Sequence, residues 1–455
     1  MRHRTFLLFT FMIPVGLTTG CFDAHGPAGD GGVRDGALDA DVDAAALPSP
    51  CATLCEPPRV VARVPFESPL GFNVVASLLD MVVHRGELVV AMSQSALEES
   101  GLIYVLARVS RQTGEARLEV VDMTLPDRDH VTPSIIAGAL ASRGETLTLV
   151  AARADPHDYP SSYPFSYQPT VLVGTWEGAA TAPRLVHHPL IDPDGEPPAQ
   201  CPGCLARGAA VGIGEQTGLV GVGAEGELWL GRVDLATAAM TRETLAMPGV
   251  VPATSLDARG DRSGVGLLAV GGTRQIAAAV EGPAYALALD ESTLQAPISM
   301  PGAPSDPTPH PWLHDGALEM VRFQRDEGLS DGRLYWYAIE GDTTVELRAI
   351  STAGDLPPLA MASTSSALFW VEASLASVGE SDLRVLAARR TCAGDEEAMA
   401  RTVLHLPRPI GTPDPRALVA TEHEGRTYVG VLEDDGGEGR VALVVFDLGT
   451  CRTGG

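Results

Sequence analysis

Short apolar runs separated by turns dominate the chain from about residue 57 to its end. The runs are about 5–8 residues long and the residues between them are rich in Gly and Asp, as in 79–90, which is divided at Arg85-Gly86. No long stretch places its apolar residues with the 3.6-residue period of an amphipathic helix, whereas short apolar runs bounded by turn residues are typical of strands. The pattern therefore predicts an all-β domain built from hairpins.

The hairpins recur at a nearly regular interval. Their ranges are 79–90, 140–150, 210–222, 266–280, 318–339, 359–371 and 418–431, with the fourth turn expected at Gly271-Gly272-Thr273 and the fifth at Asp331-Gly332. Most hairpins are followed by further apolar arms, such as 102–109 and 116–121, so that a unit of roughly 50 residues holds about four strands. This repeat resembles the β-propeller class of folds. The resemblance implies seven four-stranded blades, and tandem β-sandwiches are the alternative architecture.

One apolar segment, residues 59–66, precedes the first hairpin and has no hairpin partner of its own. In propellers an N-terminal strand often completes the last blade and so closes the ring. We therefore expect residues 59–66 to pair with the last unit of the chain.

The N-terminus has the character of an export signal. Arg2 and Arg4 precede an apolar run from residue 6 to 17, and the small residues Thr18-Thr19-Gly20 precede Cys21. This segment resembles the signal of bacterial lipoproteins, although Thr18 stands three before the cysteine, where Leu is commonest. The resemblance implies cleavage before Cys21, acylation of Cys21 and, with Phe22 next, transfer to the outer membrane, facing the periplasm or the surface. An ordinary cleaved signal and an uncleaved anchor are the alternatives.

Residues 21–56 are expected to form an acidic, disordered tether. The stretch is rich in Gly, Ala and Asp, and it has too little apolar surface to offset the entropy of ordering. The domain organisation is therefore a signal peptide over 1–20, a lipid-anchored tether over 21–56 and a β-propeller over 57–455.

Composition excludes several kinds of chemistry. The 32 basic residues are all arginine, so neither a phosphate-binding P-loop nor a Schiff base can form with a lysine. The formal net charge of −26 disfavours contact with a phosphate backbone, so nucleic acid is not an expected partner. The Gly-x-Ser-x-Gly and His-Glu-x-x-His signatures are also missing. No cofactor and no metal site is predicted.

The cysteines predict disulfides. An acylated Cys21 leaves six others, an even number in an exported chain: Cys51, Cys55, Cys201, Cys204, Cys392 and Cys451. Proximity in sequence favours three pairs, which are Cys51–Cys55, Cys201–Cys204 and Cys392–Cys451. A zinc or redox role for Cys201-x-x-Cys204, near His187 and His188, is the alternative, although a second Cys-x-x-Cys is missing.

The candidate binding residues lie in an aromatic insertion between two apolar runs. Tyr159, Tyr163, Phe165 and Tyr167 stand on a Pro-containing stretch and could bind a glycan or a peptide, or could pack on the blade surface instead. His310 and His314 lie in a Pro-rich stretch before the fifth unit and are expected to be polar loop residues.

The sequence as a whole predicts an exported, lipid-anchored β-propeller that is a binding or scaffold protein of the cell envelope. Its partners would be the membrane, through the lipid, and a glycan or protein ligand. The alternative is a hydrolase or lyase that acts on a polysaccharide or another envelope polymer, because propellers carry both kinds of function.

Overall fold

The computed structural model describes a series of segments between residues 53 and 453. They are 53–54, 57–66, 74–96, 102–121, 134–157, 166–190, 208–224, 226–247, 249–250, 254–261, 264–274, 279–280, 284–290, 294–301, 309–314, 317–325, 332–351, 358, 360–377, 380–388, 400–409, 418–434, 441–449 and 452–453. Contacts divide the chain into two units, Met1–Leu47 and Pro48–Gly455, and all described residues belong to the second. The expected signal peptide, lipidated Cys21 and most of the tether lie outside the described residues.

Every regular element in these segments is a β-strand, and seven sheets, here called blades 1 to 7, account for nearly all of them. Blade 1 contains β3 (Val74–His84), β4 (Glu87–Ala96), β5 (Leu102–Ser110) and β6 (Ala116–Val121). Blade 2 contains β7 (Ser134–Arg143), β8 (Thr146–His157), β9 (Ser166–Glu177) and β10 (Arg184–Pro189). Blade 3 contains β11 (Gly208–Ile213), β12 (Thr217–Ala224), β13 (Glu227–Asp234) and β14 (Met240–Ala246). Blade 4 contains β15 (Thr254–Gly260), β16 (Val265–Arg274), β17 (Ala279–Val280), β18 (Ala284–Asp290) and β19 (Ile298–Met300).

The remaining blades follow the same plan. Blade 5 contains β20 (His310–His314), β21 (Ala317–Arg325), β22 (Gly332–Glu340) and β23 (Thr343–Ser351). Blade 6 contains β24 (Ala360–Ser363), β25 (Leu368–Ser377), β26 (Glu380–Ala388) and β27 (Ala400–Pro409). Blade 7 contains β28 (Leu418–His423), β29 (Arg426–Asp434), β30 (Val441–Asp447) and, from the other end of the chain, β2 (Arg59–Phe66). A separate two-stranded sheet joins β1 (Thr53–Leu54) to β31 (Arg452–Thr453).

Tight turns connect the first two strands of several blades. Between β3 and β4, His84 pairs with Glu87, and the two residues between them, Arg85 and Gly86, have φ angles of 52° and 82°. Positive φ at both central residues defines the hairpin turn whose twist matches that of the flanking strands. Glu424 and Gly425 repeat this conformation between β28 and β29. The turns predicted at these two places are confirmed.

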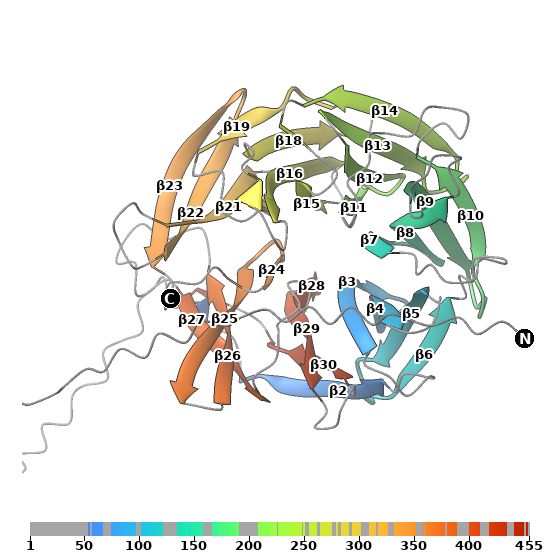
Figure 1. Cartoon of the computed structure of the whole chain (residues 1–455). Helices are drawn as coiled ribbons and strands as arrows, with labels where there is room; N and C mark the ends of the chain where they lie inside the picture. The colour runs from blue at the N-terminus through green and yellow to red at the C-terminus, as the bar shows by residue number, and fades with distance from the viewer. Residues whose placement is uncertain are drawn as a thin grey trace, which may run out of the picture. The chain divides into compact units, whose positions relative to one another are not determined.

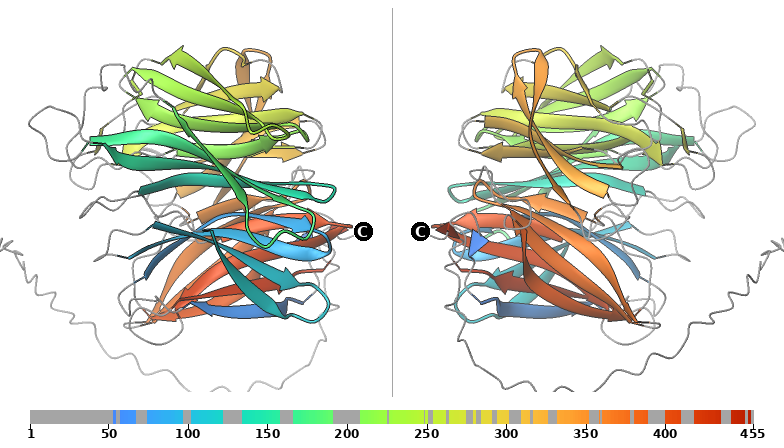
Figure 2. Two further views of the ribbon diagram at one scale, coloured as in Figure 1. Left: turned by 90° about the vertical axis from the view of Figure 1, so that its right-hand side faces the viewer. Right: turned by 90° about the vertical axis from the view of Figure 1, so that its left-hand side faces the viewer.

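The blades form a closed ring in chain order (Figure 1). The first strands of the blades contact one another in the order β3, β7, β11, β15, β20, β24 and β28, and β28 in turn contacts β3. Figure 2 shows the ring from two sides, with the blades lying face to face. Seven clusters of buried apolar residues lie among the described segments, one between each pair of neighbouring blades. The chain is therefore a seven-bladed β-propeller, as the repeat implied, and the sandwich alternative is wrong.

The N-terminal strand closes the ring. β2 pairs antiparallel with β30, from Arg59 opposite Asp447 to Phe66 opposite Val441. Its buried residues Ala62 and Val64 join the apolar cluster between blades 7 and 1. The expectation that residues 59–66 complete the last unit is confirmed.

Two of the expected hairpins were wrongly placed. The turn expected at Gly271-Gly272 is continuous strand in β16, because β16 pairs with β15 on one side and β18 on the other. The turn expected at Asp331-Gly332 falls between β21 and β22, the second and third strands of blade 5, and Gly332 already belongs to β22; the first strand is β20, where a loop was expected. Pro311 is tolerated there because β20 pairs only with β21, so the strand has an unpaired side for a residue without an N–H.

Within the described part of the chain, no helix has the length and apolar character needed to cross a membrane.

Candidate functional site

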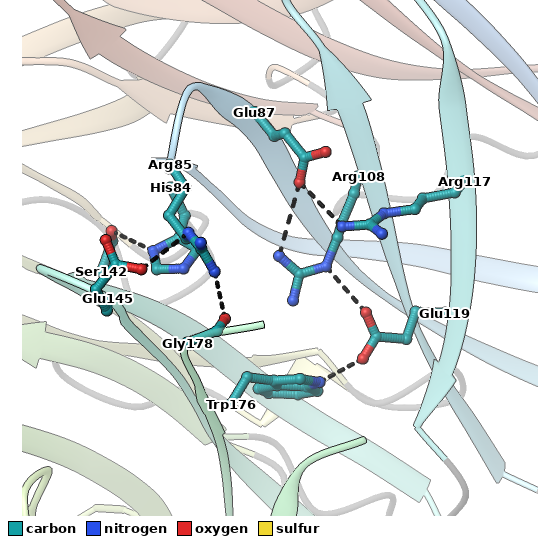
Figure 3. A network of polar contacts seen from close by, with 10 residues as sticks. All are labelled: His84, Arg85, Glu87, Arg108, Arg117, Glu119, Ser142, Glu145, Trp176 and Gly178. Carbon is teal, nitrogen blue, oxygen red and sulfur yellow. Dashed lines mark hydrogen bonds and ion pairs between the residues drawn. The ribbon is translucent and has the colours of Figure 1, made fainter. Parts of the chain in front are cut away.

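A first polar network joins blades 1 and 2 (Figure 3). Arg108 is buried, and its Nε donates to Glu119 Oε2 over 2.9 Å. The other oxygen of Glu119 accepts a hydrogen bond from the indole N–H of Trp176 on β9. Glu87 Oε2 lies 4.0 Å from Arg108 Nη1 and 3.3 Å from Arg117 Nη2. The buried guanidinium is thus balanced by two carboxylates, and one of them also holds the neighbouring blade.

This network has a structural role. Beside it, His84 Nδ1 lies 2.9 Å from Ser142 Oγ, and Arg85 Nε lies 3.1 Å from Glu145 Oε2. Burial, with Arg108 and Arg85 nearby, lowers the pKa of His84 and keeps its ring neutral. Both of these contacts cross from blade 1 to blade 2, and no described carboxylate is hydrogen-bonded to His84. The network therefore fixes one blade boundary and offers no reactive group.

A second cluster lies where the innermost strands converge, and it starts on β15. Side chains alternate along a strand, so Leu256 and Ala258 join the apolar cluster between blades 3 and 4. Asp257 and Arg259 project from the opposite face of β15, and each keeps about a third of its side-chain surface exposed (32% and 31%). The alternation therefore leaves two charged groups accessible at the centre of the ring.

Asp257 is held by a hydrogen-bonded chain that crosses three blades. Its Oδ2 lies 2.7 Å from His310 Nδ1 on β20, and His310 Nε2 lies 3.2 Å from Ser363 Oγ on β24. The other oxygen, Oδ1, accepts the backbone N–H of Ala258 over 2.8 Å and lies 3.8 Å from Arg259 Nη1. Because a carboxylate only accepts hydrogen bonds, Nδ1 of His310 carries a proton. In the neutral ring, Nε2 then accepts the Ser363 hydroxyl proton.

The protonation states in this chain follow from the surroundings. Burial is the largest effect on His310, which is 2% exposed, and it lowers the pKa of the imidazole despite the carboxylate beside it. Burial would raise the pKa of Asp257, but Arg259 and His310 together outweigh it, so the pKa of Asp257 lies below its usual value. Asp257 is therefore an anion with a neutral histidine behind it.

Asp80 is the counterpart of Asp257 on the innermost strand of blade 1. Its oxygens accept the backbone N–H groups of Met81 over 2.8 Å and Leu140 over 2.7 Å. Burial nevertheless raises the pKa of Asp80, and Arg259, three blades further round the ring, is among the groups that oppose the rise. One guanidinium thus acts on two carboxylates whose pKa values are moved in opposite directions.

The exposure of these three residues differs from that of a nucleophilic Ser-His-Asp site. In a Ser-His-Asp nucleophilic site, the carboxylate is the buried end and orients the histidine. Here the carboxylate of Asp257 is 32% exposed and His310 is 2% exposed, while Ser363 is partly buried like Asp257, so the carboxylate is not the buried end. Asp257, with Arg259 beside it, is therefore open to a ligand, and the buried His310 is a positioning residue for it.

The opposite pKa shifts give opposite pH dependences of stability. An aspartate with a lowered folded pKa stabilises the protein above its unfolded pKa, near 3.8, and this contribution is lost as the pH falls through the folded value. For Asp80, with a raised folded pKa, the contribution is present below 3.8 and is lost as the pH rises through the folded value.

We therefore expect the melting temperature of Asp257→Asn, relative to the unsubstituted protein, to fall as the pH rises from about 2.5 to 4. The relative melting temperature of Asp80→Asn should rise as the pH rises above 4. Thermal unfolding of the three proteins across this range is the measurement. Equal slopes for the two variants would contradict the assignment.

The sequence-predicted site residues are only partly described. Tyr167 lies on β9, opposite Pro156 of β8, so both ends of the aromatic insertion are strand. Tyr159, Tyr163 and Phe165 lie outside the described residues, as do all six cysteines expected in disulfides. His188 lies on β10, and its Nε2 is 2.7 Å from the carbonyl oxygen of Ala238. Among the described residues, no group of three or more His, Cys, Asp and Glu could hold a metal ion.

The sequence reasoning missed most of the ring-centre cluster. His310 was expected in a loop, but the structure places it in a strand with two side-chain partners. Asp80, Asp257 and Ser363 were not recognised, although a lone carboxylate inside an apolar run, as in Leu78-Leu79-Asp80-Met81, was an available signal.

Comparisons with known proteins give only distant matches to solved structures. No family model matches the chain, and no curated protein matches it in sequence. Among solved structures, a Trypanosoma rangeli sialidase matches with a TM-score of 0.41 at 12% identity, over 86% of this chain and 58% of that one. The NanB sialidase from Streptococcus pneumoniae matches with a TM-score of 0.44 at 9% identity, over 77% of this chain and 70% of that one. A Pyrococcus horikoshii acylaminoacyl peptidase matches with a TM-score of 0.40 at 9% identity, over 79% of this chain and 49% of that one.

The chain covers less than two thirds of the length of the first of these proteins. Matches at such low sequence identity do not indicate the activity of this chain.

Proposed function

We propose that this protein is an exported, lipid-anchored binding protein of the cell envelope that holds a polar ligand at the centre of its propeller. The observation that carries the proposal is the pairing of Asp257 and Arg259, a partly exposed acceptor and donor 3.8 Å apart, with Asp257 oriented by a buried histidine. A carboxylate accepts hydrogen bonds from hydroxyl groups and a guanidinium donates them. A hydroxyl-rich ligand such as a glycan meets both requirements.

The location is proposed from the sequence. Acylation of Cys21 would attach the chain to the outer membrane, and residues 22–50 would span roughly 30 Å as a flexible coil. Cell fractionation tests this: Cys21→Ser should move the protein from the membrane fraction to the soluble fraction. Unchanged membrane association of Cys21→Ser would contradict the anchor.

Ligand binding is tested by thermal shift on the purified chain against glycans, peptides and divalent ions. A ligand at 100 times its Kd stabilises the folded state by about 2.7 kcal/mol. We expect a glycan to raise the melting temperature and Asp257→Asn to abolish the rise. Glu346→Gln, which removes the same charge from an exposed position on β23, is the matched control and should keep it. A rise of equal size in Asp257→Asn, or a response to peptides alone, would contradict the proposal.

A glycan hydrolase is the second candidate, and one observation favours it. Asp80 and Asp257 lie on the innermost strands of two blades and have pKa values moved in opposite directions, and glycoside hydrolases use one protonated and one ionised carboxyl group as general acid and partner. In this case the purified protein would release reducing ends from an envelope polysaccharide. Asp80→Asn would then abolish release while the glycan-induced thermal shift remained.

A further inference from the structure

The described charged groups at the centre of the ring are two carboxylates and one guanidinium. Asp257 is an anion, His310 is neutral, and Arg259 is a permanent cation. Asp80 is the second carboxylate, and Arg259 acts on its pKa as well as on that of Asp257. One guanidinium therefore serves two carboxylates, which belong to blades 1 and 4.

The hydrogen bond between Asp80 and blade 2 places the Asp80 carboxylate at the centre of the ring. β7 is the innermost strand of blade 2 and pairs only with β8, so its other edge faces the centre (Figure 1). Backbone N–H groups alternate between the two edges of a strand. The N–H of Leu140, which donates to Asp80 Oδ2 over 2.7 Å, therefore points from this inner edge. Asp80 is half-buried there, so part of its surface is accessible.

The two carboxylates differ in the partners that hold them. Asp257 has His310 at 2.7 Å and Arg259 at 3.8 Å. Arg259 Nη1 also donates to the carbonyl oxygen of Ala258 over 3.1 Å, which keeps the guanidinium on β15. The hydrogen bonds of Asp80, in contrast, come from two backbone N–H groups. Since each carboxylate oxygen can accept two hydrogen bonds, each oxygen of Asp80 can accept one more.

We propose that the ring centre selects glycans that carry a free amino group, with the ammonium bound by Asp80 and neighbouring hydroxyl groups bound by Asp257 and Arg259. The inference rests on the proposed function, because it names the substrate class of the same site. An ammonium has three donors and no acceptor, and hydrogen bonds between ionised partners are about twice as strong as neutral ones. It also supplies the second positive charge that two carboxylates require.

Other classes of glycan satisfy this site less well. An acidic sugar would bring a third carboxylate towards Asp80 and Asp257, with only the guanidinium of Arg259 to compensate, and like charges at one site disfavour ionisation. An N-acetylated sugar offers Asp80 a neutral amide with a single N–H. The excess of acidic over basic residues in the chain, 58 against 32, also attracts cations over a distance. That attraction is not specific, so the experiment must separate it from binding at Asp80.

Isothermal titration calorimetry of the full chain with three β-1,4-linked trisaccharides tests the preference. The sugars differ only at carbon 2, which carries a hydroxyl in glucose, an acetamide in N-acetylglucosamine and, at mildly acidic pH, an ammonium in glucosamine. We expect the Kd of the glucosamine trimer to be about tenfold lower than that of the glucose trimer. A glucosamine trimer that binds no more tightly than the glucose trimer would overturn the preference and leave the proposed function standing. Absence of binding by all three trimers and by every other glycan would contradict the proposed function as well.

Asp80→Asn separates binding at the ring centre from attraction to the acidic surface. The ratio of the glucose-trimer Kd to the glucosamine-trimer Kd should fall to about 1 in this variant, because an amide carries no charge. Glu346→Gln removes the same charge from an exposed position on β23 and should keep the ratio of the unsubstituted protein. A ratio that survives in Asp80→Asn would overturn the proposal.

Arg259→Gln tests the same claim without altering the hydrogen bond between Asp80 and Leu140. This variant removes the cation that competes with the ammonium of the ligand, so the ratio of the two Kd values should rise severalfold. An unchanged or lower ratio would overturn the proposal. Circular dichroism and a cooperative melt establish that each variant is folded before its Kd values are compared.

Discussion

A chain that begins at residue 67, and so lacks β2, should fail to unfold cooperatively. Loss of β2 leaves one edge of β30 unpaired along seven registered residue pairs, while β29 still pairs with the other edge, and it removes Ala62 and Val64 from the cluster between blades 7 and 1. The now uncovered edge would include Leu443 and Val445, which are fully buried in the intact ring. An exposed apolar edge strand promotes aggregation.

The control for this truncation is a chain that begins at residue 57, which retains β2 and should melt in one transition. Thermal unfolding followed by circular dichroism, together with size-exclusion chromatography, compares the two chains. A shorter chain that is monomeric and melts as sharply as the control would show that β2 does not close the ring.

Trp312→Ala should lower the free energy of unfolding by about 4 kcal/mol. Trp312 is fully buried between blades 5 and 6, in a cluster that also contains Trp336, Trp370 and Leu368. Its indole N–H donates to the carbonyl oxygen of Thr364 over 2.8 Å, so truncation removes a hydrogen bond across the blade boundary as well as a large apolar volume.

Equilibrium denaturation in urea measures this effect. Trp312→Phe keeps most of the volume and loses the N–H, so it should lose about 1–2 kcal/mol. A loss below about 1 kcal/mol for Trp312→Ala would mean that this blade boundary is not packed as described.

The hairpin units could be predicted because their signals are local. Arg85-Gly86 and Glu424-Gly425 stand between apolar runs and adopt the positive φ angles that such turns require. The closing strand was predictable for another reason: β2 was an apolar run without a hairpin partner, and a ring leaves one place for such a run.

The errors arose where local signals misled. Gly271 and Gly272 look like a turn, but β16 continues through them, because its pairing partners decide its length. β20 was missed because Pro309 and Pro311 argue for a loop, whereas a strand paired on one side only can contain proline.

The ring-centre site could not be assembled from the sequence. Asp257, His310 and Ser363 lie about 53 residues apart on three strands, and no short sequence motif links them. Only the arrangement of blades around one axis brings them within hydrogen-bonding distance. The sequence shows only that each of them is a polar residue next to an apolar residue in a short segment.

Closure of the ring is the claim on which the ring-centre site depends, and hydrogen–deuterium exchange of the intact protein tests it most directly. If β2 is the fourth strand of blade 7, the backbone amides of residues 59–66 that pair with β30 should exchange as slowly as those of 441–447. Exchange of residues 59–66 at the rate of an unstructured peptide, with 441–447 still protected, would contradict a closed seven-bladed ring.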